Sequence, residues 1–445
     1  MVTVVSKTSL TGILADDLRS IRTDFFPYLF LFLQLVYFSG LVRQFMTDEF
    51  LVLNIIFSFL LCVFNKRLTS HSFRVIAASL FAFLILNVIS SFVFGFNLRL
   101  VAGYAGRVLL GYLIVILLRD GFFERFEKLV TVLAVISLPL FIIQIFYPDF
   151  FNLFDSVSNS VLIEARLEQS ERNLYGHKYL FVFLFNGWAS IRNSGFMWEP
   201  AAFGAILSWA AIFNIIRNNF IINYRIYIFL IAALTTFSLG TYVYLTGLML
   251  FLTIKNYKST SIRIMFFIGV IIILGYQLSF TSENINMMSE KIEAEVGHRE
   301  RALSGKASET EISRLAAFEI NFNYFKDWPF GYGLAAERNS ELKYLGASPN
   351  GLMKILVTWG IFGMILIIWS VLNLIKFLGR YYSNDLSLFY IWGLTILFII
   401  PISGNPFYNQ PFLFSLLFGI WIIKAEKCMQ SEKMRYNKQI QLYKF

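Results

Sequence analysis

Two apolar runs, MFFIGVIIILGYQLSF (Met265–Phe280) and GLMKILVTWGIFGMILIIWSVLNL (Gly351–Leu374), enclose a long polar segment, Thr281–Asn350. Each run approaches the roughly 20 apolar residues with which a helix crosses a bilayer. The polar segment is predicted to contain an amphipathic helix at about Glu311–Asp327, which Trp328-Pro329 ends because proline cannot continue a helix. Apolar side chains recur on one face of this helix at helical spacing: Ile312, Leu315, Phe318, Phe322 and Phe325. We therefore expect a folded domain that packs on a membrane bundle.

The composition is that of a polytopic membrane protein. Hydrophobic residues make up 57% of the 445 residues, charged residues make up 15%, and the mean hydropathy is +0.64. A soluble domain carries far more charge. The net charge of +10 does not imply a nucleic-acid partner, because membrane proteins are often basic through their cytoplasmic loops. Three histidines and two cysteines at scattered positions predict neither a metal centre nor a disulfide, and we expect no cofactor.

The apolar stretches predict an all-α bundle of twelve membrane helices. We place them near Phe25–Leu41, Phe50–Phe64, Phe73–Phe94, Leu98–Leu118, Leu129–Tyr147, Pro200–Ile216, Ile226–Leu239, Thr241–Ile254, Ile264–Phe280, Leu352–Phe377, Leu386–Ile402 and Pro411–Ile423. One stretch, Ile226–Ile254, is ambiguous by length: it is either one long helix or a hairpin about Ser238-Leu239-Gly240.

The distribution of lysine and arginine decides this alternative, since short cytoplasmic loops are enriched in these residues. Basic residues mark five short loops and the C-terminal tail, and all lie on one side of the membrane only if Ile226–Ile254 crosses twice. Both termini are then inside, and Ser238–Thr241 is near the outer surface. The predicted parts are a cytoplasmic segment 1–24, nine helices in 25–280 with an external loop near 148–199, a large external loop 281–350, three helices in 351–423 and a basic cytoplasmic tail 424–445.

Three arginines are expected near the outer membrane face: Arg107, Arg192 and Arg314. Arg107 lies inside a predicted span, where a charge usually faces the bundle interior and is functional. The alternatives are that Arg107 reaches toward the headgroups and that Arg192 anchors its helix at the interface. Guanidinium groups suit the forked recognition of phosphate oxygens, so together the three suggest a lipid-linked phosphate or pyrophosphate.

Glu199 precedes Pro200, which suits the first turn of a helix. A carboxylate beside a helix N-terminus is stabilised by the helix dipole, and this structural role is as good an explanation of Glu199 as a chemical one.

These residues, in their order along the chain, resemble the O-antigen polymerase and ligase superfamily. The shared features are Arg192, Gly195 and Glu199-Pro200, the Ser238-centred hairpin, an outer loop with Arg314, Pro329 and Gly331-Tyr332-Gly333, Asn350-Gly351-Leu352 opening a helix that reaches Trp359-Gly360-Ile361-Phe362-Gly363, and Asn405-Pro406 followed by Pro411. The resemblance covers roughly Leu98 to Ile423. Each motif is weak alone, but their order and the twelve-span topology make the set specific.

The resemblance implies a fold similar to that of type-C glycosyltransferases and transfer of a glycan from undecaprenyl pyrophosphate to an acceptor hydroxyl. Arg192 and Arg314 are then expected to hold the pyrophosphate, with Arg107 as a weaker third ligand. Glu199 is a candidate base or orienting group for the acceptor. Asn350 would bind a sugar, although helix capping explains it equally well. Arg299 and Arg301, in the same polar segment, are further candidates for substrate binding.

One departure from the family bears on the choice between its activities. Relatives often have a histidine immediately before the asparagine that opens the helix after the loop, and here Pro349 occupies that position. This disfavours a ligase and leaves a polymerase in the bacterial inner membrane, with its active face periplasmic. The expected partners are the lipid-linked donor and acceptor, membrane lipids and a chain-length regulator. A lipid-linked oligosaccharide flippase remains the transporter alternative, but no internal repeat is evident.

Overall fold

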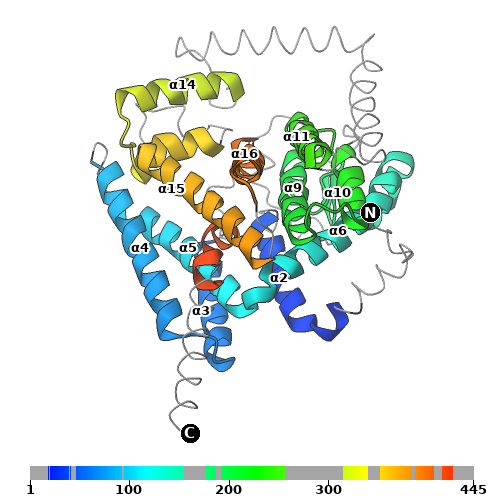
Figure 1. Ribbon diagram of the computed structural model, residues 1–445, viewed down its shortest axis with the longest axis horizontal. Coiled ribbons are helices and arrows are strands. Elements are labelled where there is room, and N and C mark those ends of the chain that lie inside the picture. Colours follow the sequence, from blue (N-terminus) through cyan, green and yellow to red (C-terminus); the bar gives the residue numbers. More distant parts are fainter. Residues whose placement is uncertain are drawn as a thin grey trace.

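The protein is an all-α membrane protein, as the sequence predicts. The computed structural model describes residues 19, 21–39, 41, 47–92, 95–154, 177–186, 192–255, 314–338, 351–382, 386–404 and 413–423. Five described helices are long and apolar enough to cross a membrane: α4 (Ser70–Ser90), α5 (Leu98–Leu118), α6 (Phe122–Phe146), α9 (Pro200–Arg217) and α15 (Gly351–Tyr381). Figure 1 shows these helices gathered in one bundle.

Shorter apolar helices complete the bundle. They are α2 (Phe25–Ser39), α3 (Asp48–Phe64), α10 (Tyr224–Leu234), α11 (Leu239–Lys255), α16 (Leu388–Gly404) and a last helix at Leu413–Ile423. Eleven of the twelve predicted spans coincide with a described helix. The remaining one, Ile264–Phe280, lies outside the described residues. The main boundary error is in α6, which begins at Phe122 rather than near Leu129. Its first turns carry charges that are paired, as in the i,i+4 pair of Lys128 and Glu124, so they belong to the helix and not to a loop.

The ambiguous stretch is a helical hairpin, so the charge argument gave the correct answer. Helix α10 ends at Leu234 and α11 begins at Leu239. The Tyr242 hydroxyl donates to the carbonyl of Leu234 at 2.9 Å, which satisfies one of the carbonyls left open at the end of α10.

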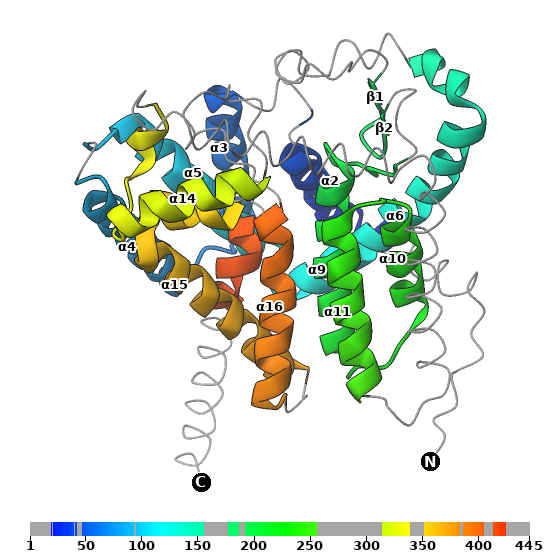
Figure 2. The same cartoon turned by 90° about the horizontal axis from the view of Figure 1, so that it is seen from above.

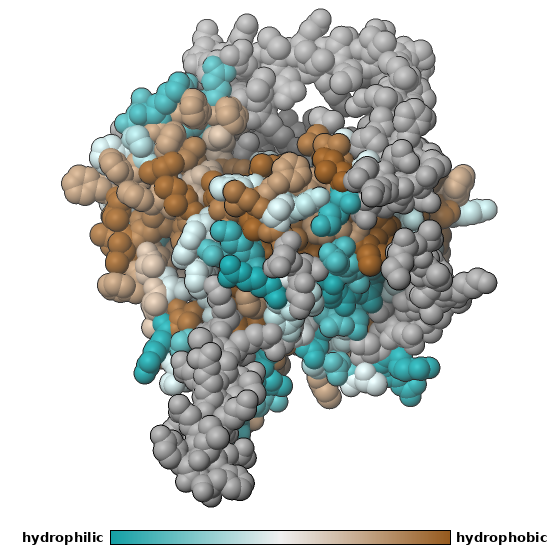
Figure 3. All heavy atoms as spheres, viewed as in Figure 1, coloured by the Kyte–Doolittle hydropathy of each residue, from teal (hydrophilic) through white to brown (hydrophobic). Residues whose placement is uncertain are grey.

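The basic loops meet at one end of the bundle. There Arg125 binds Asp24 at 3.0 Å, Arg217 lies 3.4 Å from Glu124, and the ammonium group of Lys255 lies 5.4 Å from the ring centroid of Phe220. In Figure 3, which has this end toward the viewer, hydrophilic residues gather near the middle, and hydrophobic residues cover the flank formed by α4.

The opposite end carries η3 (Pro148–Phe154) and a two-stranded antiparallel sheet of β1 (His177–Tyr179) and β2 (Leu184–Asn186). The ring of Phe151 stacks on that of Phe185, with centroids 4.6 Å apart, and so joins η3 to the sheet. Figure 2 places this sheet beyond the ends of the helices.

Helix α9 is the central helix, because its small residues admit close neighbours on several sides. A side chain at Gly204 would collide with Thr241 of α11, so only glycine permits this approach. Trp209 stacks on Phe398 of α16 at 5.3 Å, and its indole N–H donates to the Phe398 carbonyl at 3.0 Å. The position of Pro200, at the start of α9, is therefore held by the core of the bundle.

Helix α14 (Arg314–Asp327) confirms the predicted helix of the polar segment; its predicted packing face is correct at Phe325, which packs against Tyr332 and Val357, but wrong at two other positions. Phe318 and Phe322 are 42% and 37% exposed, whereas Ala317 and Ile320 on another face are buried. Small and aliphatic side chains let α14 lie close to α15, and the two phenylalanine rings stack on each other instead, at 6.1 Å. Ile312 and the side chain of Leu315 lie outside the described part of the chain.

We predict that the two ends of the bundle face opposite sides of the membrane, with the basic loops inside. A cysteine at Gly240, where the space around an added side chain is open, should react with an impermeant maleimide in intact cells. A cysteine at exposed Lys66 should react only after permeabilisation. Both native cysteines are first replaced by alanine. If only the Lys66→Cys variant reacts in intact cells, the orientation in the membrane is the opposite of the predicted one.

Candidate functional site

Helix α15 is broken at Gly360, and the turn that follows α14 fills the break. Gly360 has φ 64° and ψ −162°, so the helical hydrogen bonds around it are lost. The carbonyls of Val357 and Thr358 accept instead from the backbone N–H groups of Tyr332 and Gly333, at 2.8 and 2.9 Å. The N–H of Ile361 donates to the carbonyl of Pro329 at 2.9 Å. Three backbone hydrogen bonds thus join the turn at residues 328–333 to the helix.

Two glycines make this contact possible. A Cβ atom at Gly360 would collide with the carbonyl groups of Pro329 and Phe330. Gly331 has φ 92°, a left-handed value that favours glycine, and a Cβ atom there would meet the backbone of Thr358 and Gly360. The predicted tight turn is therefore confirmed. The break in α15 was not predicted, although a glycine within an apolar helix was its signal.

Tyr332 fixes the turn from its other side. Its hydroxyl donates to the carbonyl of Tyr324 at 3.1 Å, and its ring meets that of Tyr324 edge to face. Burial, with the nearby charge of Asp327 and the Tyr324 hydroxyl, raises the pKa of Tyr332 above its ordinary value. The phenol therefore stays protonated at neutral pH and remains a donor.

Arg107 is connected to this junction through aromatic rings. Its guanidinium lies 5.0 Å from the ring centroid of Tyr104, and Tyr104 meets Trp359 edge to face at 5.7 Å. The indole N–H of Trp359 donates to Asn87 of α4 at 3.2 Å. Arg107 is half-buried, as its predicted place within a span requires. Its charge lies near the residue that immediately precedes the break in α15.

Arg192 ties the segment before α9 to two other elements. Its Nε donates to the carbonyl of Thr236, in the turn between α10 and α11, at 3.2 Å. Its own carbonyl accepts from the side chain of Gln144 of α6 at 3.2 Å. The side chain is half-buried, so Arg192 is built into the protein rather than lying only against headgroups.

Asn193 is the central residue of this segment, and the sequence did not single it out. It is fully buried. Its amide nitrogen lies 3.2 Å from Ser137 Oγ and 2.9 Å from Thr235 Oγ1, and its amide oxygen accepts from the N–H of Gly195 at 2.8 Å. Its backbone N–H donates to the Thr235 carbonyl at 2.9 Å. These bonds hold the residues between Arg192 and Glu199 in one conformation.

Glu199 occupies the N-cap position of α9 in an extended conformation, but its carboxylate makes no capping hydrogen bond. The helix dipole still favours its charge, so the structural explanation of Glu199 stands beside the chemical one. The side chain is half-buried and follows Trp198, whose ring meets Phe38 of α2 at 6.4 Å.

The last turn of α2 lies between the two arginine regions. Phe38 contacts Trp198 beside Glu199, while the preceding residue, Tyr37, is within electrostatic range of Arg107. Arg107 and Glu199 thus both lie near the last turn of α2, and Arg192 belongs to the segment that leads to Glu199.

The described atoms do not place Arg314 near Arg107, Arg192 or Glu199. It begins α14, whose 14 residues extend about 21 Å at 1.5 Å each, and only the other end of α14 meets the break in α15. Figures 1 and 2 show the Arg314 end directed toward α16. The side chain of Arg314, and all of Arg299, Arg301, Pro349 and Asn350, lie outside the described residues.

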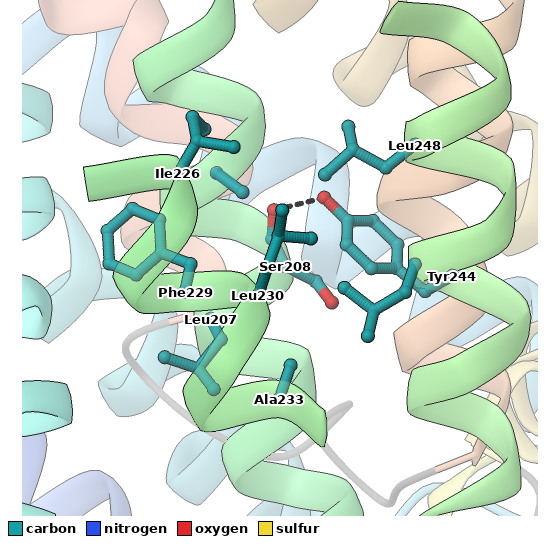
Figure 4. A pocket seen from close by; sticks show the side chains of 10 residues that line it. Leu207, Ser208, Ile226, Phe229, Leu230, Ala233, Tyr244 and Leu248 are labelled. Carbon is teal, nitrogen blue, oxygen red and sulfur yellow. Dashed lines mark hydrogen bonds between the residues drawn. The ribbon is translucent and has the colours of Figure 1, made fainter. Parts of the chain in front are cut away.

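Two further features limit the chemistry of the described residues. Among them no group of three histidine, cysteine or acidic side chains has the arrangement of a metal site. The pocket between α9, α10 and α11 is lined almost entirely by apolar side chains and leaves no room for a water molecule (Figure 4). The polar group there, the Tyr244 hydroxyl, donates to the Ser208 carbonyl at 2.6 Å. This pocket is a packing gap and not a substrate site.

We predict that Gly360→Ala uncouples the turn from α15. The substitution forces a left-handed conformation on alanine, which costs about 1–2 kcal/mol, and its Cβ would displace Pro329 and Phe330. We expect a lower thermal midpoint and at least a tenfold loss of activity. Gly103→Ala in α5, where an added Cβ meets nothing within 4 Å, is the matched control and should behave as the parent protein. Equal behaviour of the two variants would exclude a functional role for the junction.

Residues 226–368 match the model of a family described as O-antigen ligase. The matched range begins at α10 and includes α11, α14, the turn at 328–333 and the broken part of α15. The junction built by Gly331 and Gly360 therefore lies within it. No curated protein and no solved structure matches the chain.

Proposed function

We propose, on the premise that residues 226–368 place the chain in the O-antigen polymerase and ligase superfamily, that it polymerises lipid-linked oligosaccharide repeat units. The family match and the long apolar helices support the coarser part of this statement, a multi-pass membrane protein of the O-antigen ligase and polymerase type. The proposal adds the donor, a glycan on undecaprenyl pyrophosphate, and the acceptor, the terminal sugar of a second lipid-linked unit.

The observation that supports a catalytic site most strongly is that Arg192 and Glu199 lie in one fixed segment, while Arg107 lies near the last turn of α2. Arg192 is fixed from α6 and from the α10–α11 turn, and Asn193 holds the backbone that leads to Glu199. Charges that are already in place before the reaction stabilise a transition state well, because the protein does not have to rearrange around it.

The two arginines act on the donor in this proposal. As the bond between the anomeric carbon and the pyrophosphate oxygen breaks, negative charge grows on the leaving pyrophosphate. Arg192 and Arg107 neutralise that charge, and a guanidinium offers paired N–H groups that match phosphate oxygens. The lipid remains on the departing undecaprenyl pyrophosphate.

Glu199 acts on the acceptor. The acceptor hydroxyl oxygen forms the new bond to the anomeric carbon from the face opposite the pyrophosphate, which inverts the configuration there. The hydroxyl proton passes to the Glu199 carboxylate, which is half-buried and is not used in capping α9. One glycosidic bond forms and one sugar–phosphate bond breaks, so the step involves no change of oxidation state.

The proposed location is the inner membrane of a bacterium, with the catalytic end on the periplasmic side. The basic loops at the other end of the bundle support this orientation. A chain-length regulator would meet the enzyme in the same membrane.

A ligase that transfers glycan to lipid A-core is the second candidate, because the matching family is described as O-antigen ligase. Against it stands Pro349, since a proline side chain can neither donate nor accept a proton. A flippase would not need a carboxylate and two arginines held at one end of the bundle.

Deletion of the gene separates the three activities. Without a polymerase, cells should carry single repeat units, both on the carrier lipid and on the final acceptor. Without a ligase, polymer would accumulate on the carrier lipid. Without a flippase, single units would remain on the cytoplasmic side. Either of the last two outcomes, if the intact gene reverses it, would contradict the proposed polymerase activity and identify a ligase or a flippase instead.

A further inference from the structure

An apolar groove of about 460 Å³ lies between α2, α3 and the end of α5, at the end of the bundle opposite the candidate site. Leu33, Phe57 and Leu61 form its walls, and Asn65 and Arg67 lie at its end. Phe57 is 54% exposed and Leu33 44% exposed, so the groove opens sideways between the helices. In a membrane protein such an opening faces lipid.

Arg67 is the unusual residue of this groove. Its position is fixed by the backbone, because its N–H donates to the carbonyl of Cys62 at 2.8 Å and Lys66 before it adopts φ 50°. The residue is half-buried, and within the described part of the chain its guanidinium makes no hydrogen bond and no ion pair. Asp24, near the start of α2, is bound by Arg125 at 3.0 Å.

A second cation strengthens the field at this place. Arg67 and Arg119 both lie within electrostatic range of the Cys62 thiol. None of the Arg67 nitrogens is among the fully buried atoms without a partner, so they stay accessible to an acceptor at the end of the groove. The chemistry of the missing acceptor is therefore that of an anion attached to an apolar chain.

We propose that this groove binds a glycerophospholipid with an anionic headgroup. Its phosphate accepts hydrogen bonds from Arg67, and one acyl chain lies along Leu33, Phe57 and Leu61. The basic loops place this end of the bundle in the cytoplasmic leaflet, where anionic lipids collect in basic pockets between helices. The site is independent of the proposed transferase activity.

A carrier lipid bound at the candidate site does not reach this groove. Leu118 of α5 lines the groove, and Arg107 of the candidate site is about 16 Å away along the same helix at 1.5 Å per residue. A polyprenyl pyrophosphate held at the candidate site could not also place its phosphate on Arg67.

Native mass spectrometry of the full-length protein, released from detergent, tests the proposal. The protein is titrated with phosphatidylglycerol and separately with phosphatidylcholine of the same chains. Arg67→Gln removes the charge, Leu33→Trp fills the groove, and Arg74→Gln removes an exposed arginine from the same end of the bundle as a matched control. Inorganic phosphate and a polyprenyl phosphate are added as competitors.

We expect at least one phosphatidylglycerol to bind more tightly than phosphatidylcholine. Arg67→Gln removes one charge-assisted hydrogen bond and Leu33→Trp blocks the acyl chain, so each should weaken the binding of phosphatidylglycerol about tenfold. Arg74→Gln should leave this affinity unchanged. Inorganic phosphate should not displace the lipid. Equal affinities for the two lipids, equal effects of Arg67→Gln and Arg74→Gln, displacement by inorganic phosphate, or preferred binding of the polyprenyl phosphate would each overturn the assignment.

Discussion

Replacing Arg192 with alanine should abolish polymer formation while the protein still inserts in the membrane. In the proposed mechanism its guanidinium stabilises the departing pyrophosphate, and removing one such group typically slows an enzyme about 100- to 1,000-fold. The same change removes the hydrogen bond from Arg192 Nε to the Thr236 carbonyl. Cells that express the variant should accumulate single repeat units, which gel electrophoresis of the extracted glycans resolves from polymer.

Two control variants separate the charge of Arg192 from its role in holding the loop. Arg192→Lys keeps the charge but lacks the planar fork, so it should restore little activity. Gln144→Leu removes the hydrogen bond to the Arg192 carbonyl without touching the guanidinium, and a modest loss is expected. Full activity of Arg192→Ala would show that this residue only anchors its segment.

Replacing Glu127 with alanine should have the largest effect on stability. The Glu127 side chain is buried, and its Oε1 accepts from Asn214 at 2.5 Å, from Arg217 at 2.7 Å and from Arg225 at 2.6 Å. It therefore joins α6, α9 and α10 at the end with the basic loops. Removing the carboxylate leaves a buried Arg225 without this partner, a change that typically costs 3–5 kcal/mol of the free energy of unfolding. Thermal unfolding in one detergent should show a large drop in the midpoint.

Glu124→Ala is the matched control for this measurement. Glu124 also binds Arg217, at 3.4 Å, but its side chain is 43% exposed. Exposed ion pairs contribute only about 0–1 kcal/mol, so this variant should unfold close to the parent protein. If Glu127→Ala unfolds at the same temperature as Glu124→Ala, the buried carboxylate does not hold the three helices together.

The positions of the helices followed from the sequence because they depend on local properties. A run of apolar residues must be helical in a membrane, whatever its neighbours are. The hairpin between α10 and α11 could also be predicted, because the positive-inside rule counts charges and needs no contacts. Trp328-Pro329 ended α14 where expected, since proline acts on its own backbone.

Other features depend on which helices meet, and the sequence does not state this. The aromatic spacing of Phe318 and Phe322 predicted a buried face, but both rings are exposed and Ala317 and Ile320 are buried instead. The importance of Asn193 arises from Ser137 and Thr235, which are distant in the chain. Arg225 directly precedes the predicted span Ile226–Leu239, and nothing in the sequence indicated that it is buried on Glu127.

The site itself stays a prediction. Arg107, Arg192 and Glu199 were named from the sequence, and the structure shows their surroundings: Arg192 and Glu199 lie in one segment, and Arg107 lies near the last turn of α2. The junction between the turn at 328–333 and the break at Gly360 joins two motifs whose contact the sequence could not indicate. The roles of Arg314, Arg299, Arg301 and Asn350 stay predictions.

The most direct test uses the purified protein in lipid vesicles with a synthetic repeat unit on undecaprenyl pyrophosphate as both donor and acceptor. The products are separated by length, and released undecaprenyl pyrophosphate is measured in the same samples. We predict a ladder of glycans, one undecaprenyl pyrophosphate released for each bond formed, and an inverted linkage. Transfer only to added lipid A-core, with no ladder from the repeat unit alone, would contradict the proposed polymerase.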